Sequence, residues 1–230
     1  MPFGARTRER ARSGLARIRT PREYRRRYAS STRRWMLDVL YNDLTQGESR
    51  WMGVRCMKNP LDVWIYQEIL HEVRPEVLVE LGSAFGGSTL MFCHLLDVLG
   101  GDTPVVSVDH SHQDFRADHP RIVKVTGDTR DPEVIAAVHS ACGNRRGLVI
   151  HDADHNGPVV LEDLRNYFDL VAPGSYLIVE DGVRDYLAGL PGPVSAVEAF
   201  LAEVPGFTID ESRERYLLTF NPKGFLRRTA

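Results

Sequence analysis

Residues 77–89 read Val-Leu-Val-Glu-Leu-Gly-Ser-Ala-Phe-Gly-Gly-Ser-Thr, a β-favouring run that opens into a glycine-rich loop. The same rhythm continues downstream, where short β-rich runs alternate with helical stretches. We predict strands at 77–81, 105–109, 122–125, 148–152 and 176–180, and helices at 87–99, 131–141, 157–171 and 193–203. Strands and helices that alternate at this spacing form right-handed crossovers. The sequence therefore predicts an α/β fold with a parallel sheet covered by helices on both faces.

Helices are also expected before this core. Residues 31–44 form one, because four apolar residues have helical spacing: Trp35, Met36, Val39 and Leu40. Residues 60–73 form another, because Pro60 is favoured at a first helical position and Asn59 can cap it. These two helices are predicted as an N-terminal extension of the core.

The C-terminal segment is predicted to complete the sheet. Residues 207–210 and 216–220 read as strands, and the charged stretch 211–215 lies between them as a turn. An antiparallel hairpin at the sheet edge would bring the total to seven strands. The predicted fold is thus a Rossmann-like, mostly parallel seven-stranded sheet with an antiparallel C-terminal hairpin.

The composition fits one ordinary globular domain. The chain has 230 residues, of which 43% are hydrophobic and 26% charged. No apolar run approaches the roughly 18 residues of a membrane span. The basic N-terminus has no apolar segment behind it, so no secretory signal is expected. The three cysteines are scattered, which predicts neither a disulfide framework nor a cysteine metal site and indicates a cytoplasmic protein.

Charge is distributed unevenly along the chain. Residues 1–34 hold 12 arginines and two glutamates, whereas the whole chain has a net charge of −2. We predict a basic arm at 1–34 and a single domain at 35–230, with N-terminal helices at 35–74 and the core at 75–230. The arm contains little aromatic interleaving, so nucleic acid is not favoured as its partner.

An acid stands at or just beyond the end of every core strand: Glu80, Asp109, Asp128, Asp152 and Glu180. Ligands of open parallel sheets bind outside these carboxyl ends. Asp109 can accept hydrogen bonds from both hydroxyls of a ribose. His110 follows it and is placed in the adenosine pocket.

The loop after the first core strand has the pattern E-x-G-x-x-x-G-G-S, from Glu80 through Gly82 and Gly86 to Ser88. Ala84 replaces the second glycine of the dinucleotide fingerprint, which disfavours an NAD-dependent oxidoreductase. The pattern resembles motif I of the S-adenosylmethionine-dependent methyltransferases, in which this loop lies under the methionine part of the cofactor. That resemblance also implies that Asp128 reads the adenine amino group.

Three carboxylates are expected to meet at neighbouring strand ends: Asp152, Glu180 and Asp181. Clustered carboxylates repel one another, and a divalent cation removes that cost. Oxygen ligands without cysteine favour a hard ion such as Mg²⁺. His155 lies three residues after Asp152 and titrates in the range suited to a general base. We therefore assign catalytic roles to His155 and Asp152.

Several stretches, in order, resemble the cephalosporin hydroxylase / rhamnosyl O-methyltransferase family: 58–62, 66–69, 80–88, 151–155 and 174–181. The resemblance implies a Rossmann-like class I methyltransferase fold and an S-adenosylmethionine-dependent O-methyltransferase, usually Mg²⁺-dependent and oligomeric. It also implies Asp152, Glu180 and Asp181 as metal ligands. The cofactor-binding residues assigned on this basis are Lys58, Glu80, Gly82, Ser83, Gly86, Ser88, Asp109, His110, Asp128 and Asp152.

The acceptor is the least transferable part of this resemblance. A sugar hydroxyl on a glycosylated natural product is the first choice, and a hydroxylated antibiotic core is the second. Acceptor-binding residues are expected in 31–60 and 182–195. A homo-oligomer is predicted as the assembly. An RNA methyltransferase anchored by the basic arm stays open as an alternative. A non-catalytic scaffold that keeps the cofactor fold remains the alternative from another functional class.

Overall fold

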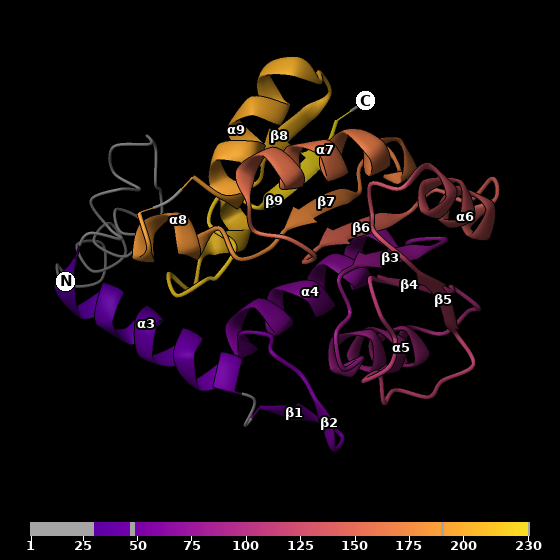
Figure 1. Ribbon diagram of the computed structural model, residues 1–230, viewed down its shortest axis with the longest axis horizontal. Coiled ribbons are helices and arrows are strands. Elements are labelled where there is room, and N and C mark those ends of the chain that lie inside the picture. The colour runs from indigo at the N-terminus through magenta and orange to yellow at the C-terminus, as the bar shows by residue number, and fades with distance from the viewer. Residues whose placement is uncertain (1–29, 47–48, 190, 230) are drawn as a thin grey trace, which may run out of the picture.

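The computed structural model describes residues 30–46, 49–189 and 191–229. A seven-stranded sheet forms its centre, in the order β5-β4-β3-β6-β7-β9-β8 (Figure 1). The strands are β3 (Leu78–Leu81), β4 (Val105–Asp109), β5 (Ile122–Thr126), β6 (Leu148–His151), β7 (Tyr176–Val179), β8 (Phe207–Ile209) and β9 (Phe225–Arg228). The first five are parallel, and β9 runs antiparallel to both β7 and β8. The predicted fold class is confirmed.

Helices cover both faces of the sheet. Helices α4 (Pro60–Val73) and α5 (Gly87–Leu99) lie on one face, and α6 (Pro132–Cys142), α7 (Gly157–Tyr167) and α9 (Pro193–Glu203) lie on the other (Figure 1). A 3₁₀ turn at Phe168–Leu170 extends α7. The short α8 (Val183–Leu187) precedes α9, and α3 (Ser31–Gln46) lies at the margin of the domain. A two-stranded hairpin, β1 (Arg50–Trp51) with β2 (Val54–Arg55), was not predicted.

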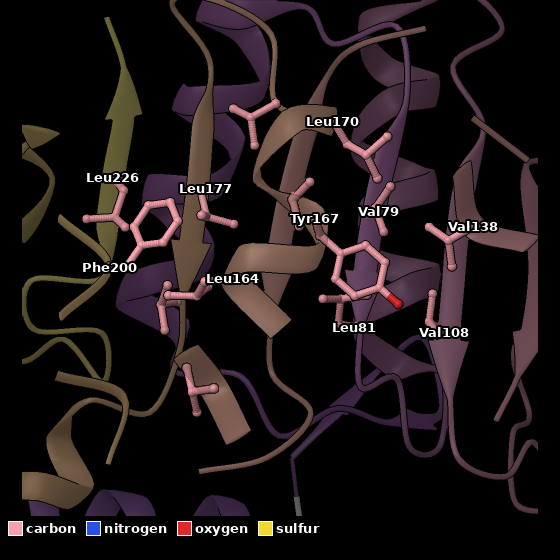
Figure 2. Close-up of a cluster of buried hydrophobic side chains, with 14 of the residues drawn as sticks. Val79, Leu81, Val108, Val138, Leu164, Tyr167, Leu170, Leu177, Phe200 and Leu226 are labelled. Atoms are coloured by element: carbon pink, nitrogen blue, oxygen red, sulfur yellow. The ribbon is translucent and has the colours of Figure 1, made fainter. Parts of the chain in front are cut away.

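The core consists of two apolar layers because the parallel strands are buried on both sides. Alternate residues of β3 point to opposite faces, so Val79 and Leu81 join the layer under α6, α7 and α9 while Leu78 joins the layer under α4 and α5. Figure 2 shows the first layer, in which Tyr167 of α7 and Val108 of β4 pack in one cluster with the β3 side chains. This packing fixes the strand ends from which the site is built.

The prediction for 216–220 is wrong, because this segment is not a strand. The second strand of the C-terminal hairpin is β9, and the predicted turn contains a 3₁₀ helix at Glu211–Glu214. Side chains take the hydrogen bonds that a ladder would need: the amide of Phe220 donates to Asp62 of α4 at 2.8 Å, and the amide of Asn221 donates to Thr219 Oγ1 at 2.9 Å. The segment thereby becomes a loop whose last two residues, Thr219 and Phe220, are buried, and Phe220 lines the cavity at the carboxyl ends of the strands.

Helix α3 forms as predicted, but of the four apolar residues that predicted it only Leu40 packs against the buried cluster. Trp35 is 65% exposed and Val39 is 47% exposed, whereas Leu37 and Leu44 are buried. Leu37 and Leu44 pack against Val183 of α8 and Phe220, so long-range contacts select the face. No helix in the described ranges is long and apolar enough to cross a bilayer. Most of the predicted basic arm, residues 1–29, lies outside the described residues.

Candidate active site

A cavity of about 250 Å³ opens at the carboxyl edge of the parallel strands. Eight predicted site residues line it: Lys58, Gly82, Ser83, Ser88, Asp109, Asp152, His155 and Asp181. A neighbouring cavity of about 220 Å³ is lined by Gly82, Asp109, His110 and Asp128, among others. The two cavities share Gly82, Asp109 and Ala153, so they form adjoining parts of one binding region. The structure therefore brings most of the predicted residues together.

The glycine loop is shaped by a close approach to the next strand end. Gly82 has φ +86°, and a Cβ at this position would lie 2.1 Å from the carbonyl oxygen of Asp152. Gly86 caps α5 with φ +83°, and its Cβ would lie 2.7 Å from the ring of Phe115. Only glycine accommodates both the backbone conformation and the contact. The loop can thus pass directly beside the backbone of Asp152, which follows β6.

Asp109 is tied to this loop. Its Oδ2 accepts the amides of Ser83 at 2.9 Å and Ala84 at 2.7 Å, and its Oδ1 accepts the amide of Ser111 at 3.0 Å. A carboxylate has about four acceptor positions, so one is still available for a ribose hydroxyl. Asp109 therefore organises the loop as well as facing the cavity.

Asp128 is held by Arg130 in the same loop. Its Oδ1 accepts from Arg130 Nε at 2.9 Å and its Oδ2 accepts from Arg130 Nη2 at 2.6 Å. These hydrogen bonds lower the pKa of Asp128 to about 2. Recognition of an adenine amino group by Asp128 stays a prediction that depends on its remaining lone pairs.

Lys58 lies among the carboxylates of three strand ends. It is only 4% exposed, and its Nζ lies 2.6 Å from Asp152 Oδ2 and 2.8 Å from Glu180 Oε1. The contact between Lys58 and Glu180 is an ion pair whose angles do not meet those of a hydrogen bond. Burial lowers the pKa of Lys58, but the charges of Asp152, Glu180 and Glu80 outweigh it and keep that pKa well above its usual value. Lys58 is thus a fixed cation inside the site.

Two predicted cofactor residues lie beneath the cavity rather than in its wall. Glu80 is fully buried, accepts the hydroxyl of Thr89 in α5, and has a raised pKa because of its burial. Gly86 is the cap of the same helix. These residues hold α5 and its loop in place, and direct contact with a cofactor remains a prediction for them.

Asp152, His155 and Asp181 converge on one point. One ligand atom from each residue lies within 4.8 Å of the others, and His155 Nε2 is 3.4 Å from Asp181 Oδ2. Burial raises the pKa of Asp181 to about 7 and lowers the pKa of His155. His155 Nδ1 is buried without a hydrogen-bond partner. Glu180, predicted as a third ligand, lies beside this group and faces Lys58, and burial holds its pKa well above the usual range.

Sequence reasoning did not single out five residues that line the larger cavity: Tyr41, Arg55, Cys56, Met57 and Phe220. The first four fall within 31–60, where acceptor contacts were expected. Tyr41 donates a hydrogen bond to Asp181 Oδ2 at 3.0 Å across 140 positions of sequence. No local pattern marks such a contact, because α3 reaches the site only through its packing on α8 and Phe220.

The sequence is similar to those of known proteins. Residues 44–229 match the model of the family described as rhamnosyl O-methyltransferase/CmcI. The chain belongs to this family. Rhamnosyl O-methyltransferase of Mycobacterium leprae is 35% identical over 198 residues, which cover 82% of this chain and 86% of that protein. The corresponding protein of Mycobacterium tuberculosis strain H37Rv is 34% identical over 199 residues, covering 82% and 81% of the two chains.

Solved structures agree with the family. The structure of CmcI named for its magnesium and S-adenosylmethionine superposes with a TM-score of 0.65 at 25% identity, covering 80% of this chain and 78% of the other. An O-methyltransferase from Bacillus cereus has a TM-score of 0.53 at 16% identity and covers 75% and 80% of the two chains, which shows the common fold. The predictions of family, fold and O-methyltransferase class are therefore confirmed.

Proposed function

We propose that this chain transfers the methyl group of S-adenosylmethionine to a sugar hydroxyl of a glycosylated natural product, with a divalent cation such as Mg²⁺ assisting. The convergence of Asp152, His155 and Asp181 beside the glycine loop carries the proposal. The rhamnosyl O-methyltransferases among its relatives support a sugar acceptor. The ligands named for the CmcI structure support S-adenosylmethionine and Mg²⁺.

The donor set fits a hard cation. Four buried or half-buried carboxylates, on Glu80, Asp152, Glu180 and Asp181, share one ammonium group, that of Lys58. Carboxylate oxygens and an imidazole nitrogen are suitable ligands. His155 Nδ1 is buried without a hydrogen-bond partner, and Glu180 Oε1 faces the ammonium group of Lys58 at 2.8 Å. Asp152 and Asp181 would hold the ion, with Glu180 or His155 beside them. When bound, Mg²⁺ supplies Lewis acidity that lowers the pKa of an acceptor hydroxyl.

His155 would receive the proton of that hydroxyl. Burial lowers its pKa, so the imidazole is neutral near pH 7 and one ring nitrogen can accept a proton. Asp181 Oδ2 lies 3.4 Å from His155 Nε2 and can stabilise the imidazolium that forms. As a ligand, His155 would use the same lone pair, so the two roles exclude each other at that nitrogen. Metal binding by His155→Ala separates them, because only the loss of a ligand weakens it.

The other residues hold the donor. The loop from Gly82 to Ser88 would lie under the methionine part of S-adenosylmethionine, and Asp109 would accept from its ribose. Because Asp109 also binds the amides of Ser83 and Ala84, the loop and the ribose acceptor move as one unit. Holding the methyl group in line with the acceptor oxygen lowers the activation free energy of transfer, by about 7–11 kcal/mol at most.

The test is methyl transfer from labelled S-adenosylmethionine to a panel of rhamnosides and their sugar-free aglycones, followed by mass spectrometry. We expect transfer to the rhamnosides only, with loss of activity in EDTA and recovery with Mg²⁺. The variant His155→Ala should lower kcat by about 10²–10⁴-fold while S-adenosylhomocysteine still binds. His139→Ala, on the far face in α6, is the matched control. Full activity in EDTA would refute the cation, and transfer to the aglycones alone would refute the sugar acceptor.

A further inference from the structure

Helix α3 contributes a phenol to the carboxylate cluster. Tyr41 lines the main cavity, and its hydroxyl donates to Asp181 Oδ2 at 3.0 Å. The ring of Tyr41 lies 5.2 Å from the ring of Phe220 at an angle of 59°. Leu37 and Leu44, one turn to either side, are buried in the same cluster. Apolar packing therefore holds the phenol of Tyr41 in a fixed position in the cavity wall.

Asp181 needs such support, because its backbone is strained. Its φ of +59° lies in the left-handed region, which a residue other than glycine seldom adopts. Its amide donates to Asn221 Oδ1 at 3.2 Å, and Asn221 Nδ2 donates to Tyr66 Oη at 2.7 Å. These contacts hold the backbone of Asp181 but do not restrain its carboxylate. The hydroxyl of Tyr41 is a donor to that carboxylate from outside its own loop.

We propose that Tyr41 is a positioning residue that fixes the carboxylate of Asp181 for the divalent cation. The inference rests on the proposed function, since it concerns the same cation. A hydrogen bond to one oxygen of a carboxylate sets the rotation of the group, and this orientation is what a small ion with strict geometry requires. Tyr41 precedes residues 44–229, the segment that matches the family. The active site of this chain thus extends into α3.

The experiment measures binding of Mn²⁺ alone to the full chain by electron paramagnetic resonance, with calorimetry as a second method. The variant Tyr41→Phe removes the hydroxyl and keeps the ring on Phe220. Tyr176→Phe is the matched control, because Tyr176 also donates to an aspartate, Asp210 Oδ2 at 2.6 Å, but on the opposite side of the domain. Loss of a partner behind a ligand typically weakens metal binding about 10- to 100-fold.

We expect Tyr41→Phe to bind Mn²⁺ about tenfold more weakly than the wild type, with Tyr176→Phe unchanged, and with S-adenosylhomocysteine affinity equal in all three. Equal Mn²⁺ affinity of Tyr41→Phe and wild type would overturn the role of Tyr41 while leaving the cation in place. Absence of Mn²⁺ binding to the wild type would refute the cation itself, and the inference with it. A lowered S-adenosylhomocysteine affinity in Tyr41→Phe would show general damage and also overturn the assignment.

Discussion

The acids on the two sides of β3 differ in how their charge is stabilised. On the side of β4 and β5, Asp109 and Asp128 accept from donors in the loops around them: the amides of Ser83, Ala84 and Ser111, and the guanidinium of Arg130. Arg130 and Asp128 are two positions apart and partly exposed. On this side of the sheet edge, the loops themselves supply the hydrogen-bond donors that stabilise both carboxylates.

On the side of β6 and β7, partners come from distant segments. Lys58 is 94 positions from Asp152, and Tyr41 is 140 positions from Asp181. Glu180 and Asp181 are buried, and burial raises the pKa of both. Aspartates at the ends of parallel strands therefore differ in their pKa: that of Asp128 is lowered, and that of Asp181 is raised. Buried carboxylates with few hydrogen-bond donors are stabilised in their charged form by a nearby cation. Asp109 and Asp128 do not depend on such a cation in the same way, because donors in their own loops stabilise their charge.

The largest expected effect comes from removing the fixed cation of the second side. Lys58→Met leaves Asp152 and Glu180 without their ammonium partner, and breaking a buried ion pair typically costs about 3–5 kcal/mol of unfolding free energy. Urea denaturation would measure the loss, and added Mg²⁺ should stabilise the variant more than the wild type. Lys223→Met, which removes a surface pair with Glu198, is the control. A loss no larger than that of the control would show that the carboxylates do not depend on Lys58.

The next effect tests the first side. Asp109→Ala removes the acceptor for the amides of Ser83 and Ala84, and hydrogen bonds to a charged group contribute about 1.5–3 kcal/mol. We expect S-adenosylhomocysteine to bind at least about tenfold more weakly, as measured by calorimetry. Asp114→Ala, an exposed acid in the same connection, should leave binding unchanged. Unaltered binding in Asp109→Ala would remove Asp109 from the cofactor site.

A smaller effect concerns Asp62, a buried acid that has neutral donors instead of a cation. Burial raises its pKa to about 7, above the 3.8 of an exposed aspartate. The folded state then binds a proton that the unfolded state has lost, so stability is highest below about pH 4 for this group and falls as the pH rises to 7. The slope reaches about 1.4 kcal/mol per pH unit. Urea denaturation at pH 5 and pH 7.5 should show a smaller difference for Asp62→Asn than for the wild type. An identical pH dependence of the two proteins would contradict the shift.

The smallest effect is expected at Arg130. It is an exposed partner of Asp128, and exposed pairs contribute little to stability and are weakened by salt. Arg130→Ala should leave the melting temperature unchanged in 0.5 M NaCl. Its pair holds the pKa of Asp128 near 2, so NMR titration of Asp128 in the variant should show a higher pKa. An unchanged titration would mean that the loop amides alone hold the carboxylate.

Local sequence patterns predicted most of the fold. Four elements have the predicted bounds: the strand at 105–109 and the helices at 60–73, 87–99 and 193–203. Their bounds are set by apolar periodicity, glycines and prolines, which are signals that extend over only a few residues. The strand-end acids followed from topology, since parallel strands bring their carboxyl ends to one edge. The prediction of a strand at 216–220 is wrong because the amide of Phe220 donates its hydrogen bond to Asp62, which is remote in sequence.

The candidate site divides in the same way. The glycine loop, Asp109, Asp152, His155 and Asp181 could be predicted, because each lies at the end of a strand, or within a few residues of it, and the sequence specifies where that strand is. The partners that set their charge could not. The contacts of Lys58 and Tyr41 join segments far apart in the chain, and no periodicity encodes which distant side chain reaches a given carboxylate.

The sequence by itself determined the alternation of strands and helices and the row of acids at one sheet edge, because both depend on residue type and short spacing. The tertiary structure alone decided which face of α3 is buried, that Lys58 lies between Asp152 and Glu180, and that Tyr41 reaches Asp181. The physical reason is that burial and Coulomb interactions depend on distance in space, and packing of the whole chain sets that distance.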